Sequence, residues 1–518
     1  MNPLHAIDFY KADHRNQYPQ GTEYVYSNGT PRSNRLSNTG ADKLVFFSLQ
    51  AAMMKFLIKD FNEGFFNLPK AEVLRKYQRR MDNALGQGAI TVEHIEALHD
   101  LQYLPIHIKA LPEGSQVPMG VPVFTVINTV PAFFWLTNYL ESVLSNMIWK
   151  GSTSATTAFE YKKLLTKYAR MTGSPEELIQ FQAHDFSFRG MSGLEDAMMS
   201  GMAHLTSFTG TDTVLAIDGL EDYYEGNSDI ELLGCSVPAT EHSVMCMGGL
   251  EDEIGTFSRL LDTYPVGIVS IVSDTWDFWK VLTEYAPALK EQILARTPVF
   301  APDGTVIAPG KTVFRPDSGD PVKILTGYTE DEIIHLGGVA YERTDYPDEH
   351  GKELSEAEIK GAVEVLWDEF GGTETSKGYK LLNEHVGLIY GDSITLSRAT
   401  QIMERLEAKG FASMNTVLGI GSYTYEYVTR DTYGFAMKAT WGVVNGEQRE
   451  IFKDPITDSG EKKSAKGLLR VIKENGEFKL LDQQTKAQEA RGELKSVFLD
   501  GELMNTCSIR KIRERLEV

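Results

Sequence analysis

Most residues of this chain that could do chemistry lie in short polar segments, each directly after an apolar run with the character of a β-strand. Seven such segments follow one another: HDFSFRG (184–190), GTDTV (210–214), SVPATEHS (236–243), VSDTWD (272–277), FRPDSGDP (314–321), YGDS (390–393) and LGIGS (418–422). They contain arginines, whose planar forks suit phosphate, and carboxylates, which can hold sugar hydroxyls or carry Mg²⁺ through water. Polar residues at the carboxyl ends of successive strands are typical of the mouth of a (β/α) barrel, where such enzymes have their active sites. The pattern predicts an enzyme.

Helical patterns follow most of the polar segments, as a barrel requires. They cover 193–208, 242–262, 277–294 and 395–409. The alternation of strands and helices runs from about 180 to 425, close to the roughly 250 residues of such a barrel. We therefore predict an α/β fold with an irregular barrel over 151–425, interrupted by an acidic, turn-rich insertion at 327–375.

The two ends of the chain are expected to form a second unit, because 518 residues are too many for one core. Residues 1–150 mix strands and helices. After residue 430 two strands flank Asn445-Gly446, a strong hairpin-turn signal. We predict that 1–150 and a β-rich 426–518 pack into one α+β accessory domain.

Composition and charge restrict the classes of partner and location. With 72 acidic and 51 basic residues the net charge is −21, which disfavours binding to nucleic acid or to an anionic membrane. No segment has the roughly 18 clean apolar residues of a transmembrane helix, and the N-terminus lacks the features of a secretory signal. Three cysteines without a CxxC pair give no disulfide framework, so a cytoplasmic location is expected.

Two other patterns resemble known sites but lack necessary features. The segment 304–312 has one residue too many between its glycines for a phosphate-binding P-loop, and Pro309 removes a backbone donor. Cys235 and His242 have no further ligands at a spacing that suits a metal, so a buried structural cysteine is expected.

The chain resembles the nicotinamide phosphoribosyltransferase family through an ordered set of motifs that extends from about residue 6 to 470. These are DFYK, HDFSFRG, GTDTV, SVPATEHS, SD, RPDSGDP, GD, TRD and FKDP. The resemblance implies an irregular α/β barrel of the type II phosphoribosyltransferase kind and a homodimer with active sites shared between subunits. The implied reaction transfers phosphoribose from 5-phosphoribosyl 1-pyrophosphate to nicotinamide and gives nicotinamide mononucleotide, a precursor of NAD.

The resemblance assigns four residues to the nicotinamide site. Tyr10 and Phe186 match the aromatic pair that sandwiches the pyridine ring, with Tyr10 coming from the other subunit. Such a stack adds about 0.5–1.5 kcal/mol beyond burial. Asp212 matches the aspartate that accepts a hydrogen bond from the carboxamide nitrogen, and Arg189 matches an arginine beside the base. The Asp212 carboxylate would repel nicotinate by roughly 4 kcal/mol at about 4 Å and an effective dielectric of about 20, which favours the amide as substrate.

Further matches concern phosphoribose, pyrophosphate and Mg²⁺. The expected phosphoribosyl- and phosphate-binding residues are Arg315, Gly391, Asp392, Gly421, Ser422, Arg430, Lys438 and Lys453. The resemblance implies that the last three come from the other subunit. Asp274 and Asp317 match catalytic carboxylates near the ribose and pyrophosphate. Mg²⁺ is expected to be carried mainly by the substrate, because this ion keeps several waters and takes few protein ligands.

His242, in SVPATEHS, matches the histidine that the family phosphorylates from ATP. A neutral imidazole nitrogen can accept a phosphoryl group, and the resulting phosphohistidine is labile enough to pass its energy on. ATP is therefore expected as phosphoryl donor and activator. Glu241 precedes His242 in sequence, and whether its side chain orients the ring is left open.

Four positions depart from the family pattern, and two other functions are weighed against the first. Ser422 and Tyr423 stand where glycines are common, Gly387 replaces an arginine, and Ala436 replaces a hydroxyl residue. These changes bear on nucleotide affinity and ATP coupling and leave the reaction class intact. A nicotinate-using enzyme is disfavoured by Asp212, and a non-catalytic binding protein by the retained aromatic pair and His242.

Overall fold

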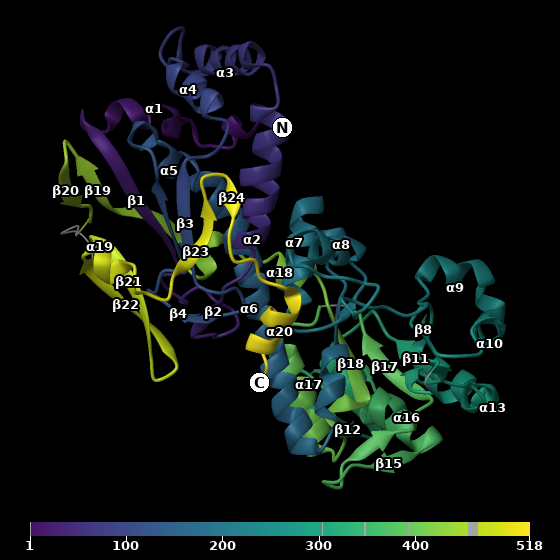
Figure 1. Cartoon of the computed structure of the whole chain (residues 1–518). Helices are drawn as coiled ribbons and strands as arrows, with labels where there is room; N and C mark the ends of the chain where they lie inside the picture. Colours follow the sequence, from purple (N-terminus) through teal and green to yellow (C-terminus); the bar gives the residue numbers. More distant parts are fainter. Residues whose placement is uncertain (1, 303, 346–348, 392, 454–464) are drawn as a thin grey trace.

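The computed structural model describes residues 2–302, 304–345, 349–391, 393–453 and 465–518, and two sheets organise it (Figure 1). One is a six-stranded parallel sheet and the other a seven-stranded antiparallel sheet. Among the described residues, no helix combines the length and apolar character needed to cross a bilayer.

The parallel sheet has the order β7-β6-β18-β17-β11-β8. Its strands are β6 (Ala183–Asp185), β7 (Gly210–Thr211), β8 (Ile268–Val272), β11 (Lys311–Arg315), β17 (Val386–Tyr390) and β18 (Thr416–Ile420). All six are short, β8, β17 and β18 are mainly apolar, and every residue of β17 is buried, as expected for a strand that is covered on both faces. The segment 235–240 bridges the two edges, because Cys235 pairs with Gly210 of β7 and Ala239 pairs with Ser270 of β8. The predicted irregular barrel is confirmed.

Helices follow the barrel strands and cover the outside of the sheet. The main ones are α7 (Leu194–His204), α8 (Val214–Tyr223), α9 (His242–Gly248), α10 (Glu253–Thr263), α13 (Lys290–Leu294), α14 (Pro321–Thr326), α16 (Ala362–Phe370) and α17 (Leu396–Ala408). The apolar faces of α9, α10, α13, α14, α16 and α17 join those of the strands in one core, and those of α7 and α8 belong to a neighbouring core cluster. The carboxyl ends of the strands and the loops that follow them stay open at one end of the barrel, which is the barrel mouth.

The antiparallel sheet interleaves both ends of the chain in the order β20-β19-β1-β5-β3-β23-β24. Its strands are β1 (Thr22–Thr30), β3 (Ile106–Ala110), β5 (Phe124–Asn128), β19 (Ala436–Val444), β20 (Glu447–Glu450), β23 (Lys495–Leu499) and β24 (Glu502–Leu503). The predicted hairpin is confirmed, because Asn445 and Gly446 have φ of 51° and 76° between β19 and β20. Helices α1 (Phe9–Gln17), α3 (Lys70–Leu85) and α4 (Glu93–Leu101) belong to the same α+β unit.

Helix α6 (Glu141–Thr172) joins the two units. Leu144 packs in the core of the antiparallel sheet, and Leu165 packs in the barrel core. The helix ends at Gly173, whose φ of 73° makes it a left-handed cap of the kind that glycine favours. The predicted domain boundary at residue 150 falls inside this helix.

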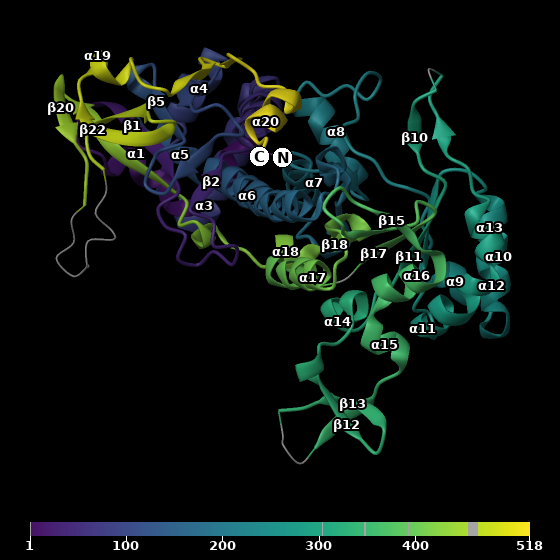
Figure 2. The ribbon, with the colours of Figure 1, turned by 90° about the horizontal axis from the view of Figure 1, so that it is seen from below.

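The predicted insertion consists of two different parts. Strands β12 (Ile333–Leu336), β13 (Val339–Arg343) and β14 (His350–Glu353) form a small antiparallel sheet that projects from the barrel (Figure 2). Farther along, α16 buries Val363 and Leu366 in the barrel core. The second half of 327–375 therefore belongs to the barrel.

Candidate active site

The barrel mouth holds Phe186 directly after β6, with its ring facing a glycine. The Phe186 amide donates to the carbonyl oxygen of Ile420 at 2.9 Å, which fixes the loop against β18. A Cβ on Gly419 would lie 2.7 Å from the Phe186 ring and 2.6 Å from the carbonyl oxygen of Tyr390. Only glycine leaves room for the ring at this position.

Asp212, just beyond β7, has its carboxylate held by two donors. His184 Nε2 lies 2.8 Å and Ser236 Oγ 2.7 Å from the same oxygen, Oδ1. Burial alone would raise the pKa of Asp212, but these hydrogen bonds and the nearby Arg315 guanidinium leave it below its ordinary value. Asp212 is therefore an ionised acceptor near Phe186, since the His184 ring also contacts the Phe186 ring, with 4.6 Å between centroids.

A second carboxylate, Asp185, organises the loops beneath this site. Asp185 is fully buried, and its Oδ1 accepts from the Ser187 amide at 2.9 Å. Its Oδ2 accepts from Thr213 Oγ1 at 2.7 Å, and its backbone carbonyl accepts from the Asp212 amide at 3.0 Å. Because these bonds use its acceptors, Asp185 acts as a structural support for the strand ends.

His242, at the start of α9, faces the carboxylate of Asp274. Its Nε2 lies 3.1 Å from Asp274 Oδ1, and the other oxygen of Asp274 accepts from the Asp317 amide at 3.0 Å and from Ser318 Oγ at 2.6 Å. The side chain of His242 is 48 % exposed, whereas that of Asp274 is 6 % exposed. Asp274 thus orients the ring, while Glu241 accepts a hydrogen bond from Ser243 instead.

The remaining expected residues of the barrel lie around these two groups. Arg315 donates through Nη2 to the carbonyl oxygen of Thr240 at 2.6 Å, which places its guanidinium beside the His242 segment. A Cβ on Gly391 would lie 2.4 Å from Asp317 Oδ1, so glycine is needed there for close approach. Arg189 is exposed on the turn that precedes Gly190.

The same turn lies against the predicted phosphate-binding segment. A Cβ on Gly190 would lie 2.0 Å from Ser422 Oγ. Ser422 begins the short helix α18 (Ser422–Tyr425), with Gly421 as the residue before it. Arg189, Gly421 and Ser422 therefore occupy one sector of the barrel mouth.

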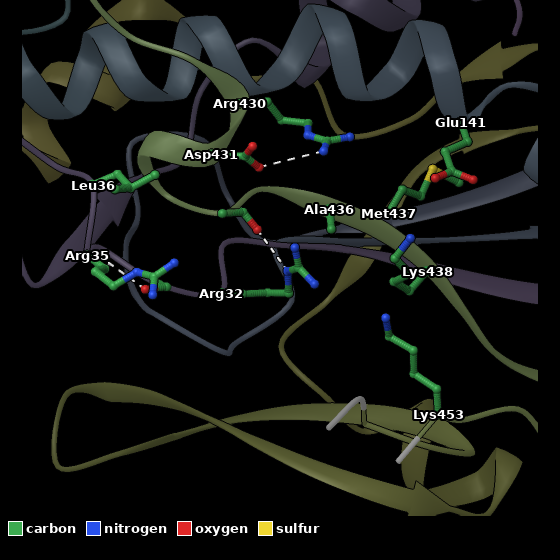
Figure 3. A pocket seen from close by; sticks show the side chains of 12 residues that line it. Arg32, Arg35, Leu36, Glu141, Arg430, Asp431, Ala436, Met437, Lys438 and Lys453 are labelled. Carbon is green, nitrogen blue, oxygen red and sulfur yellow. Dashed lines mark hydrogen bonds and ion pairs between the residues drawn. The ribbon is translucent and has the colours of Figure 1, made fainter. Parts of the chain in front are cut away.

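A second group of expected residues lies on the accessory unit, around a cavity of about 530 Å³. Figure 3 shows Arg32, Arg430, Lys438 and Lys453 arranged around it. Burial lowers the pKa of the Lys438 ammonium, and Glu141 opposes that shift. Such a set of cations suits a multiply charged anion such as a phosphate group.

Tyr10 lies on α1 near this cationic cavity, which we call the accessory cavity. Its ring is 58 % exposed, and the charges of Glu141 and Arg430 both act on its phenol. No residue that lines the accessory cavity is one of the expected barrel-mouth residues. Figures 1 and 2 agree in placing α1 and β1 well apart from β11, β17 and β18.

Comparisons with known proteins show the family to which the chain belongs. The nicotinate phosphoribosyltransferase (NAPRTase) family model matches residues 181–502, and the nicotinamide phosphoribosyltransferase N-terminal domain matches residues 2–63. The chain is 59 % identical to nicotinamide phosphoribosyltransferase of Acinetobacter baylyi, over 100 % of this chain and 97 % of that one. The chain belongs to the nicotinamide phosphoribosyltransferase family. It is therefore a phosphoribosyltransferase. Nicotinamide phosphoribosyltransferase of Mycoplasma pneumoniae is 33 % identical to the chain, over 88 % of this chain and 93 % of that one.

Two solved structures share the fold of this family member at low sequence identity. Nicotinate-nucleotide pyrophosphorylase from Pyrococcus furiosus matches with a TM-score of 0.54 and 13 % identity, over 99 % of this chain and 95 % of that one. Human nicotinic acid phosphoribosyltransferase matches with a TM-score of 0.50 and 15 % identity, over 98 % and 92 %. Both support the barrel and accessory architecture.

The residues predicted for the site thus fall into two groups within one chain. The barrel mouth carries Phe186, Arg189, Asp212, His242, Asp274, Arg315, Asp317, Gly391, Gly421 and Ser422. The accessory unit carries Tyr10, Arg430, Lys438 and Lys453. Asp392 lies outside the described residues. The individual roles stay predictions.

The sequence interpretation missed residues in both parts of the family site. His184 and Ser236 stand inside the motifs HDFSFRG and SVPATEHS, so the motifs themselves were the available signal. Gly419 stands in LGIGS. Arg32 and Arg35, which line the accessory cavity, follow β1 in the sequence. Apart from their charge, nothing in the sequence indicates that they belong to a site.

Proposed function

We propose that this enzyme transfers phosphoribose from 5-phosphoribosyl 1-pyrophosphate to nicotinamide, and that His242 couples the reaction to ATP. The observation that carries the choice of base is the Asp212 carboxylate, which two donors hold near the Phe186 ring. An ionised acceptor suits an amide N–H and repels the carboxylate of nicotinate.

The transfer needs positioning more than acid–base chemistry, because the pyridine nitrogen of nicotinamide already has a free lone pair. That lone pair forms the bond to the anomeric carbon as the bond to the pyrophosphate oxygen breaks, and pyrophosphate leaves with the electron pair. Phe186 aligns the ring, and Arg315 stabilises the negative charge that develops on the leaving group.

Magnesium fits this site as an ion that arrives with the substrate. Among the described residues there is no cluster of three or more His, Cys, Asp or Glu side chains that could hold a metal. Asp274 is occupied by protein donors on both oxygens. Asp317 and Asp274 would hold the hydrated ion through its waters, and Mg²⁺ would neutralise charge on the pyrophosphate.

The geometry around His242 supports its proposed phosphorylation at Nδ1. Asp274 faces donors on both oxygens and accepts from the imidazole, so Nε2 carries the proton and Nδ1 keeps its lone pair. In the proposed step Nδ1 bonds to the γ-phosphorus of ATP as the bond from that phosphorus to the bridging oxygen breaks, and ADP leaves. Asp274 stabilises the positive charge of the phosphorylated ring.

We also propose that two copies share their active sites. The accessory cavity and Tyr10 would face the barrel mouth of the second copy, which brings an aromatic ring to Phe186 and cations to the phosphates. The separation of the two groups within one chain supports this arrangement.

The test of the proposed function is product formation by the purified chain with 5-phosphoribosyl 1-pyrophosphate, Mg²⁺ and nicotinamide, with and without ATP. We expect nicotinamide mononucleotide and pyrophosphate in equal amounts, with faster formation and acid-labile phosphoenzyme when ATP is present. Absence of the mononucleotide under both conditions would contradict the proposal.

A further inference from the structure

His184 lies between the two barrel residues expected to contact the base. It stands on β6, with a side chain that is 12 % exposed. Its ring centroid is 4.6 Å from that of Phe186, and its Nε2 is 2.8 Å from Asp212 Oδ1. A Cβ on Gly210 would lie 2.8 Å from His184 Nδ1, so the glycine on the neighbouring strand leaves the space that the imidazole occupies.

We propose that His184 is a positioning residue that holds the Asp212 carboxylate and the Phe186 ring in register and so sets the preference for the amide over the acid. This inference rests on the proposed function. The inference adds to the proposed function a residue that does not itself contact the reacting atoms.

The tautomer of His184 follows from its partner. A carboxylate only accepts, so Nε2 carries the proton that bonds to Asp212. Ser236 donates to the same oxygen at 2.7 Å. Two donors on Oδ1 fix the rotation of the carboxylate, and Oδ2 accepts no hydrogen bond within the described part of the chain. Oδ2 is thus the oxygen available to the carboxamide of the substrate.

The same hydrogen bond lowers the pKa of Asp212. The charged or titratable groups that face it are His184 from β6 and Arg315 from β11, with Asp185 buried beneath and bound to its own donors. Burial works against ionisation, so removal of the His184 donor raises the pKa of Asp212.

Two polar variants test the position of the donor. His184→Gln places an amide N–H near the position of Nε2, whereas His184→Asn places it near Nδ1, out of reach of Asp212. His184→Phe keeps a ring against Phe186 and removes the donor altogether. The readouts are KM and kcat for nicotinamide and for nicotinate between pH 6 and pH 8, with thermal unfolding as the check on folding.

For His184→Asn and His184→Phe we expect a KM for nicotinamide about tenfold higher, as for the loss of one hydrogen bond to a charged group, with a smaller change in kcat. The nicotinamide-to-nicotinate ratio of kcat/KM should fall by about the same factor. His184→Gln should keep most of the wild-type ratio.

If a folded His184→Asn or His184→Phe variant keeps the wild-type ratio across the pH range, His184 does not position Asp212 and the inference is overturned. The proposed function stands in that case, because the wild-type enzyme in the same series still uses nicotinamide. A wild-type enzyme that uses neither base would instead overturn the proposed function.

Discussion

The split of the site between two units predicts complementation between inactive subunits. Tyr10→Ala damages the accessory half of a site, and Asp317→Ala damages the barrel half. In a mixed dimer with shared sites, one site combines the two intact halves and the other combines the two damaged halves. Random mixing gives about half mixed dimers, so about one quarter of wild-type activity should return; isolated mixed dimers should show about one half.

The control for this experiment is the pair Tyr10→Ala and Arg430→Ala. Both residues lie on the accessory unit, so each site of that mixed dimer lacks one of them and little activity should return. The assay is co-expression with two different tags, sequential affinity purification and measurement of mononucleotide formation per dimer. Mixed Tyr10→Ala/Asp317→Ala dimers no more active than either parent would refute the shared site.

Three further substitutions test single features of the barrel mouth. Asp212→Ser should lower the nicotinamide-to-nicotinate ratio of kcat/KM by about 10- to 100-fold. This is less than full Coulomb repulsion would give, because the Asp212 side chain is 44 % exposed and solvent screens its charge. An unchanged ratio would count against the role of Asp212. His242→Ala should abolish nicotinamide-linked ADP formation and leave residual ATP-independent transfer, and ADP formation at the wild-type rate would remove this histidine from the mechanism. Gly419→Ala should raise KM for nicotinamide at least about tenfold, because the new Cβ displaces the Phe186 ring. The Cβ also meets the backbone carbonyl of Tyr390, which cannot shift without an energetic cost. A wild-type KM would show that the loop adjusts.

Much of this architecture could be predicted because local signals and their three-dimensional result agree. The polar segments lie at strand ends, and the Asn445-Gly446 turn and the Gly173 cap each have the conformation that their residue types favour. The family motifs place the two aromatic residues and the carboxylates among the predicted site residues, and their roles stay predictions.

Features that depend on strand register could not be predicted in this way. His184 reaches Asp212 only because β6 pairs with β7 and places His184 beside Gly210. The need for glycine at 419 depends on Phe186, which is more than 200 residues away in sequence. Arg32 and Arg430 meet at one cavity only because β1 pairs with β19 across the sheet.

The domain boundary at residue 150 and the extent of the insertion at 327–375 could not be predicted for a different reason. In both places, tertiary packing overrode the local preference of the sequence. Residues 151–157 of α6 are glycine, serine, alanine and threonine, most of which are poor helix formers, yet they are buried within one continuous helix. Residues 362–370 follow an acidic, turn-rich stretch, but their apolar face packs in the barrel core. Neither result is visible in a short sequence window.

The most direct test of the central claim is a competition between the two bases in one reaction. The wild-type enzyme is given equal concentrations of labelled nicotinamide and labelled nicotinate with limiting 5-phosphoribosyl 1-pyrophosphate, and the two mononucleotides are separated and counted. A fixed, ionised Asp212 predicts that nicotinamide mononucleotide forms in large excess. Equal amounts of the two products, or an excess of nicotinate mononucleotide, would contradict the account of how this site selects its substrate.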